Sequence, residues 1–134
     1  MKLNLLVVDD SWAMRKFVVK QARAVGDVVG EVREAGNGKE ALAALKTEPA
    51  DVVLCDINMP EMDGLELAKA LREDPSLESI PVIIISSDPA LSREAEFRQL
   101  GAIGYIEKPF TPVKLSSEFE RLFGLARLLV ASSK

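Results

Sequence analysis

An unbroken apolar run at residues 52–55, closed by Asp56, is the feature that most limits what this chain can fold into. A strand that faces solvent on one side alternates apolar and polar residues, so an unbroken run is typical of a strand buried on both faces. Strands of that kind belong to parallel sheets with helices on both sides, and Met59-Pro60 and Asp63-Gly64 supply turn signals after this one. Ligands of open α/β sheets bind beyond the carboxyl ends of the strands, so Asp56 is expected at a binding site.

Strands and helices are expected to alternate along the chain. Four more apolar runs have the length of strands, at 3–8, 28–35, 81–85 and 103–106, and the weak pattern at 28–35 indicates an edge strand. Apolar residues at helical spacing occupy the segments between and after them, at about 11–25, 37–47, 64–73, 89–100 and 112–130. This order predicts an α/β fold with a single doubly wound five-stranded parallel sheet, helices on both faces and right-handed crossovers.

The last helix is expected to begin after Thr111 with Pro112, because a capping residue followed by proline is a helix-start signal. The residues expected on its inward face are Val113, Leu115, Phe119, Leu122 and Phe123. Apolar residues continue to Val130, and a helix of that length overruns a strand of about six residues, since it rises roughly 1.5 Å per residue. The overhanging turn at 125–130 is expected to contribute to self-association, as in a possible homodimer, or to target docking.

Composition narrows the class of protein. A chain of 134 residues, 48% of them hydrophobic, suits one domain with a single core, and we expect 1–134 to be that domain. The net charge of −4 argues against a nucleic-acid partner, because contacts to phosphates need a basic surface. The sequence has no membrane-spanning run and no signal-peptide pattern, and its one cysteine, Cys55, cannot form an internal disulfide. We therefore expect a cytoplasmic protein without membrane contact, with Cys55 as an inert core residue.

Acidic residues follow two of the predicted central strands: Asp9 and Asp10 the first, and Asp56 the third. Carboxylates that lie close together repel one another, and a divalent cation relieves that repulsion. The chain has no histidine, which excludes the common zinc sites and makes Mg²⁺ the expected ion. Beside such an ion one carboxylate can attack phosphorus, as in aspartyl-phosphate intermediates. Ser86 and Lys108, which follow the fourth and fifth strands, supply a hydroxyl donor and a cation for phosphoryl oxygens.

Five motifs in order resemble those of response-regulator receiver domains, and most closely those of the stand-alone, CheY-like chemotaxis type. They are Asp9-Asp10, Asp56-Ile-Asn-Met-Pro60, Met62-Asp-Gly-Leu-Glu-Leu67, Ser86 after an isoleucine run, and Lys108-Pro109-Phe110. The resemblance runs from Leu3 to about Phe123. It implies a flavodoxin-like strand order, 2-1-3-4-5.

The resemblance also implies which residues bind the metal and accept the phosphoryl group. Asp56 is expected to be the phosphoacceptor. Asp10 and Asp56 are expected to bind Mg²⁺ directly, together with the backbone carbonyl of Asn58, and Asp9 is expected to lie close by, partly linked through water. Asn58 also occupies one of the variable positions that flank the site, and Asp88 occupies the other.

Phosphoryl binding and the switch are expected to use three residues from the last two strands. Ser86 and Lys108 are expected to hold the phosphoryl group, and Tyr105 to swing inward when Ser86 moves toward it. Ser86 stands where threonine is commonest in the family, which keeps the hydroxyl. Pro109 restricts Lys108 to an extended backbone. Trp12 is expected beside the site because it closely follows the acidic pair.

The expected function is a phosphorylation-dependent switch of a two-component system, and not an enzyme. A sensor histidine kinase or phosphotransfer protein is the expected donor, since the chain has no histidine. A target protein is expected on the face formed by the helix at 89–100, the strand at 103–106 and the last helix. That face has five acids, so the acidic flagellar-switch peptide is not the expected target; they are Glu94, Glu96, Glu107, Glu118 and Glu120.

Three other functions are possible on the same pattern. A Mg²⁺-dependent phosphohydrolase with an aspartyl nucleophile would need a second carboxylate where Asn58 stands and a cap domain for its substrate. Flavin binding would need a phosphate loop rich in glycine and hydroxyl residues after the first strand, where Asp9-Asp10-Ser11 stands. A degenerate receiver binds its partners without being phosphorylated. It would not need Asp9, Asp10 and Asp56 together, so the presence of all three argues against this alternative.

Overall fold

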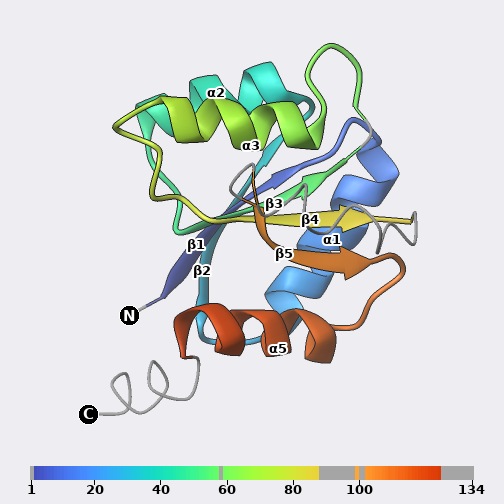
Figure 1. Ribbon diagram of the computed structural model, residues 1–134. Helices are drawn as coiled ribbons and strands as arrows, with labels where there is room; N and C mark the ends of the chain where they lie inside the picture. The colour runs from blue at the N-terminus through green and yellow to red at the C-terminus, as the bar shows by residue number, and fades with distance from the viewer. Residues whose placement is uncertain (1, 58, 88–98, 100–101, 125–134) are drawn as a thin grey trace.

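The five predicted strands form one parallel sheet in the computed structural model, which describes residues 2–57, 59–87, 99 and 102–124 (Figure 1). The strands are β1 (Leu3–Val8), β2 (Val29–Ala35), β3 (Val52–Asp56), β4 (Val82–Ser86) and β5 (Ala102–Glu107). Their order is β2-β1-β3-β4-β5, and every neighbouring pair is parallel. The doubly wound α/β fold and its flavodoxin-like order are therefore confirmed, and β2 lies at an edge of the sheet as predicted.

Each described helix follows a strand and begins at a capping side chain. The described helices are α1 (Trp12–Ala24), α2 (Gly38–Thr47), α3 (Gly64–Glu73) and α5 (Pro112–Phe123). Their caps are Ser11, Asn37, Asp63 and Thr111, and each accepts a hydrogen bond from the backbone N–H three residues later. Such a cap contributes about 1 kcal/mol to helix stability. Short polar residues in the loops that follow the strands thus determine where the helices start.

The described helices cover both faces of the sheet. Helices α2 and α3 lie on one face, and α1 and α5 lie on the other (Figure 1). Successive residues of β3 point to opposite faces, so Val53 packs in the core beneath α2 and α3 while Leu54 packs beneath α1 and α5. Phe119 of α5 is fully buried, and removing such a side chain from water contributes roughly 1.5–3 kcal/mol. An unbroken apolar strand sequence is what this two-sided burial requires.

Two expectations for the last helix are wrong. Val113 does not face inward, because it is 74% exposed. The inward residues Leu115 and Phe119 are four residues apart, whereas Val113 precedes Leu115 by only two, which is about 200° around a helix of roughly 3.6 residues per turn. The helix also does not run unbroken to Val130. It ends at Phe123, because Gly124 takes the left-handed conformation with φ of 66°.

Several predicted features lie outside the described residues. They are the helix at 89–100 apart from residue 99, the apolar turn at 125–130, and the site positions Asn58 and Asp88. Within the part of the chain that the structure does describe, no helix has the length and apolar character needed to cross a bilayer.

Candidate functional site

Three carboxylates meet at the carboxyl ends of β1 and β3. Val8, the last residue of β1, is paired in register with Cys55 of β3, so the residues that follow both strands leave the sheet side by side. Asp9, Asp10 and Asp56 each offer a carboxylate oxygen, and these oxygens lie within 4.8 Å of one another. The acidic cluster predicted from the strand ends is therefore present.

The two neighbouring acids have different surroundings. Asp9 is only 2% exposed, and its Oδ1 accepts a hydrogen bond of 2.9 Å from the backbone N–H of Ser11. Asp10 is exposed to solvent. Asp9 is thus held inside the turn between β1 and α1, while Asp10 remains accessible to a ligand.

Lys108 brings a positive charge to this cluster from the end of β5. Its Nζ lies 3.2 Å from Oδ2 of Asp9 and 3.4 Å from Oδ1 of Asp56, and its side chain is 10% exposed. Its backbone N–H donates a hydrogen bond of 2.8 Å to the carbonyl of Ser86, which ties the end of β5 to that of β4. The peptide bond between Lys108 and Pro109 is cis. One ammonium group facing three carboxylates leaves a surplus of negative charge at the site.

Burial and charge act in opposite directions on Asp56. Partial burial raises the pKa of its carboxyl group above the usual value, Lys108 offsets part of that rise, and repulsion from Asp9 adds to it. Its neighbour Cys55 is fully buried, and burial raises the pKa of that thiol well above its usual value. Cys55 is therefore a protonated core residue, as the sequence indicated.

Ser86 and Tyr105 lie on the neighbouring strands. Ser86 is the last residue of β4 and is 1% exposed, so its hydroxyl lies inside the protein and not on the surface. Tyr105 is paired in register with Ile84 of β4, and its half-buried ring packs against the core beneath α2 and α3. Ser86 thus lies at the end of the fourth strand, as the sequence indicated, and Tyr105 lies within the predicted fifth strand.

Trp12 is the first residue of α1 and is 66% exposed. The amino group of Lys16, one turn along the helix, lies 5.7 Å from the centroid of its ring. This contact places the indole on the outer surface of the first helical turn.

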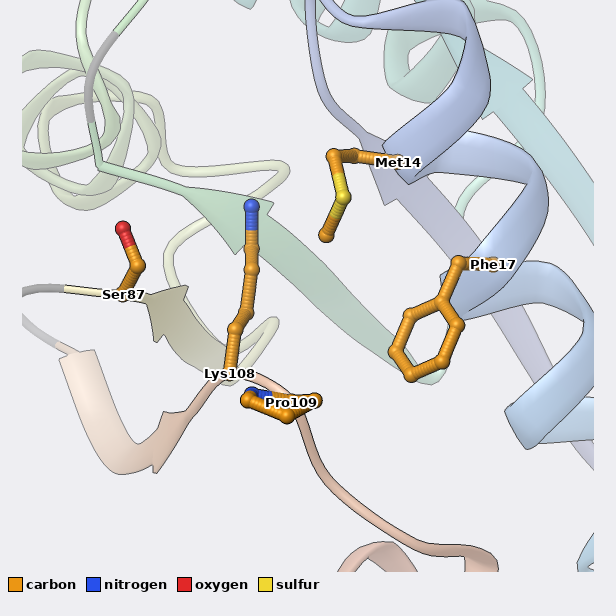
Figure 2. A pocket seen from close by; sticks show the side chains of 5 residues that line it. All are labelled: Met14, Phe17, Ser87, Lys108 and Pro109. Carbon is orange, nitrogen blue, oxygen red and sulfur yellow. The ribbon is translucent and has the colours of Figure 1, made fainter.

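A hollow of about 430 Å³ opens beside Lys108 (Figure 2). Met14 and Phe17 of α1 form one side, Pro109 lies at the base beside Lys108, and Ser87 lies across from them. Phe17 also contacts Phe110 edge to face, with ring centroids 5.6 Å apart. Met14 and Phe17 are both half-buried, and Ser87 was not predicted at the site.

Two supporting residues were also missed. The backbone of Gly64 approaches β3 so closely that a Cβ atom there would lie 2.6 Å from the carbonyl oxygen of Asp56. Arg15 of α1 donates a hydrogen bond of 2.8 Å to the carbonyl of Asp9. The Asp-Gly dipeptide signalled a turn but not this close approach, and nothing local in the sequence distinguishes Arg15 from other surface arginines.

Comparison with known proteins identifies the class to which this fold and site belong. Residues 5–120 match the family described as "Response regulator receiver domain". The chain is 36% identical over 121 residues to chemotaxis protein CheY-3 of Vibrio cholerae, an alignment that covers 90% of this chain and 92% of that protein. It is 37% identical over 123 residues to the chemotaxis protein CheY homolog of Campylobacter jejuni, covering 91% and 93% of the two chains.

A solved structure agrees with these sequence matches. The structure of chemotaxis protein CheY4 of Vibrio cholerae superposes with a TM-score of 0.80 at 32% identity, covering 90% of this chain and 98% of that one. The chain therefore belongs to the response regulator receiver domain family. Within that family it is similar to the CheY type, which confirms the resemblance seen in its motifs.

Proposed function

We propose that this receiver domain is a phosphorylation-dependent switch that accepts a phosphoryl group on Asp56 from a sensor histidine kinase or a phosphotransfer protein. The observation that supports this most strongly is the position of the Asp56 carboxylate. It lies within 4.8 Å of the oxygens of Asp9 and Asp10 and 3.4 Å from the amino group of Lys108. A nucleophile thus stands between groups that can hold a cation and a group that can neutralise a phosphoryl oxygen.

The donor set fits Mg²⁺. All three side chains offer oxygen, and their surplus of negative charge is what a hard divalent cation neutralises. Asp10 and Asp56 would hold the ion with the backbone carbonyl of Asn58, while Asp9 is already engaged by Ser11 and Lys108. The ion would supply charge neutralisation on the transferring phosphoryl oxygens.

In the transfer, a carboxylate oxygen of Asp56 attacks the phosphorus of a phosphohistidine. The new oxygen–phosphorus bond forms as the phosphorus–nitrogen bond breaks, and the bonding electrons leave with the imidazole nitrogen of the donor. The product on this chain is an acyl phosphate at Asp56. None of the 134 residues is histidine, so the phosphohistidine must lie outside them.

Lys108 and Ser86 would bind the phosphoryl group after transfer. Lys108 contacts Asp56 directly in this structure, and the same amino group would pair with a phosphoryl oxygen once Asp56 is phosphorylated. Ser86 would donate its buried hydroxyl to another phosphoryl oxygen. Because Tyr105 lies on β5 next to the strand that ends in Ser86, movement of Ser86 would be followed by an inward movement of the Tyr105 ring.

The resulting change would be detected by a target protein. The described part of the proposed output face is β5 with α5, where Glu118 and Arg121 form an ion pair of 2.8 Å. A face of mixed charge favours a target that carries both signs of charge over a uniformly acidic peptide.

Intact-mass measurement tests the phosphoacceptor. Acetyl phosphate with Mg²⁺ is expected to add one phosphoryl group to the wild-type protein and none to Asp56→Asn. Asp51→Asn is the matched control, because Asp51 is an exposed aspartate at the other end of the same strand, where it accepts a hydrogen bond from the backbone of Asn4. It should be labelled like the wild type. Equal labelling of the wild type and Asp56→Asn would refute the proposal.

A further inference from the structure

Arg15 connects the turn that carries the acidic pair to the edge strand of the sheet. Its Nη1 donates a hydrogen bond of 2.8 Å to the carbonyl oxygen of Asp9, and its Nε donates one of 2.9 Å to Oε1 of Glu34 on β2. The side chain is only 16% exposed. A guanidinium group is planar and rigid, so the two bonds together determine its orientation.

The carbonyl that Arg15 holds belongs to the peptide group between Asp9 and Asp10. A peptide group is planar, so holding its oxygen also determines the direction in which the chain enters Asp10. The Asp9 side chain is held separately by Ser11 and Lys108, whereas Asp10 is exposed to solvent. The position of the Asp10 carboxylate therefore depends on the orientation of this peptide.

We infer that Arg15 is a positioning residue for the metal-binding carboxylates, and that it holds Asp10 where a divalent cation can be shared with Asp56. This inference rests on the proposed Mg²⁺ site. Residues that orient metal ligands typically change metal affinity by about 10- to 100-fold when they are removed. A guanidinium group that acted only as a nearby positive charge would instead repel the ion, so its removal would tighten binding. The two roles therefore predict opposite changes in Mg²⁺ affinity when Arg15 is replaced.

Lys16 provides a matched control on the same helix. Its amino group donates a hydrogen bond of 2.8 Å to Oε2 of the same Glu34, and it carries the same charge as Arg15. Among the described residues, the side chain that bonds the Asp9 carbonyl is that of Arg15. Replacing each residue in turn therefore separates the contact with Asp9 from the loss of one positive charge near the site.

Calorimetric titration with Mg²⁺ is the test. Arg15→Ala is expected to bind Mg²⁺ about tenfold more weakly than the wild type. Lys16→Ala should bind it equally well or slightly more tightly. Arg15→Lys keeps the charge but loses the planar guanidinium group, so it should also bind Mg²⁺ more weakly than the wild type. If Arg15→Ala does not fold, Arg15→Lys is the variant that tests the inference. Wild-type or tighter affinity in the folded Arg15 variants would overturn the inference.

The carbonyl carbon resonance of Asp9, recorded by NMR without metal, gives a second measurement. It should move in Arg15→Ala and stay in place in Lys16→Ala, because only the first change removes a hydrogen bond to that oxygen. An unchanged resonance in Arg15→Ala would contradict the contact itself. If the wild-type protein did not bind Mg²⁺, both the proposed metal site and this inference would be wrong. If the wild type and Arg15→Ala bound Mg²⁺ equally tightly, only the inference would be wrong.

Discussion

Gly64 packs directly on the carbonyl group of Asp56. The first residue of α3 thus lies against the last residue of β3, and a Cβ atom at Gly64 would stand 2.6 Å from the Asp56 carbonyl oxygen and 3.0 Å from the Cα of Ile57. The backbone N–H of Gly64 donates a hydrogen bond of 2.9 Å to the carbonyl of Ile57. The absence of a side chain at this position is therefore what allows the chain after Asp56 to close back on the strand.

Gly64→Ala is expected to destabilise the protein by about 1–3 kcal/mol, because the new methyl group would meet backbone atoms that cannot move aside. Gly36→Ala is the matched control. Gly36 lies between β2 and α2, and the atoms nearest to a Cβ atom there, at 3.3 Å and beyond, are the far ends of the Glu40 and Arg15 side chains, which can move aside. Urea unfolding measures both free energies of unfolding. If both variants lost the same free energy of unfolding, the contact with Asp56 would not be the cause of the destabilisation.

Asp56→Asn is expected to unfold at a higher temperature than the wild type in metal-free buffer, because it removes one of three carboxylates that repel one another. Mg²⁺ should raise the melting temperature of the wild type, since an ion that binds only the folded state stabilises it. It should raise that of the variant much less. Differential scanning calorimetry with and without Mg²⁺ makes the comparison, and a similar Mg²⁺ response in both proteins would count against Asp56 as a ligand.

Lys108→Ala should keep Mg²⁺ binding at wild-type strength or tighten it. The amino group of Lys108 lies within 3.4 Å of carboxylate oxygens of Asp9 and Asp56, so it competes with a cation for the same charge. Asp10→Ala should reduce the affinity severely. Calorimetric titration measures both. A Lys108→Ala protein that is folded and yet binds Mg²⁺ much more weakly would show that the lysine supports the ion.

Glu34→Gln should make stability less dependent on pH in the acid range. The hydrogen bond from Lys16 is the main cause that lowers the pKa of Glu34 below its usual 4.5, and Arg15 also lowers it. A lowered pKa in the folded state means that the ionised carboxylate stabilises the fold above pH 4.5, and that this contribution is lost as the pH falls toward the folded-state pKa.

The expected size of this effect is at most about 1 kcal/mol at pH 7, because the pair is partly exposed. Urea unfolding at pH 7 and at acid pH should show the variant less stable than the wild type only at the higher value. Glu31→Gln is the control, since Glu31 is an exposed glutamate on the same strand. If the free energies of unfolding of the wild type and Glu34→Gln differed by the same amount at acid pH as at pH 7, the prediction would be contradicted.

The sequence alone determined the sheet and the strand ends at which the site is built. Apolar runs, capping residues and turn dipeptides act within a few residues of one another, so they show where each strand stops and therefore that Asp9, Asp56, Ser86 and Lys108 share one edge. The same local signals placed Asp63 at the start of α3, where the structure shows a capping box with Glu66.

Tertiary packing decided the rest, because it depends on groups that are far apart in the sequence. Asp9 and Asp10 are neighbours with identical side chains, yet Asp9 is buried and contacts Lys108, 99 residues away, whereas Asp10 is exposed. The bridge from Arg15 to Glu34 likewise spans 19 residues and joins a helix to an edge strand. Such contacts form only when the sheet brings distant strand ends together, so no local pattern can indicate them.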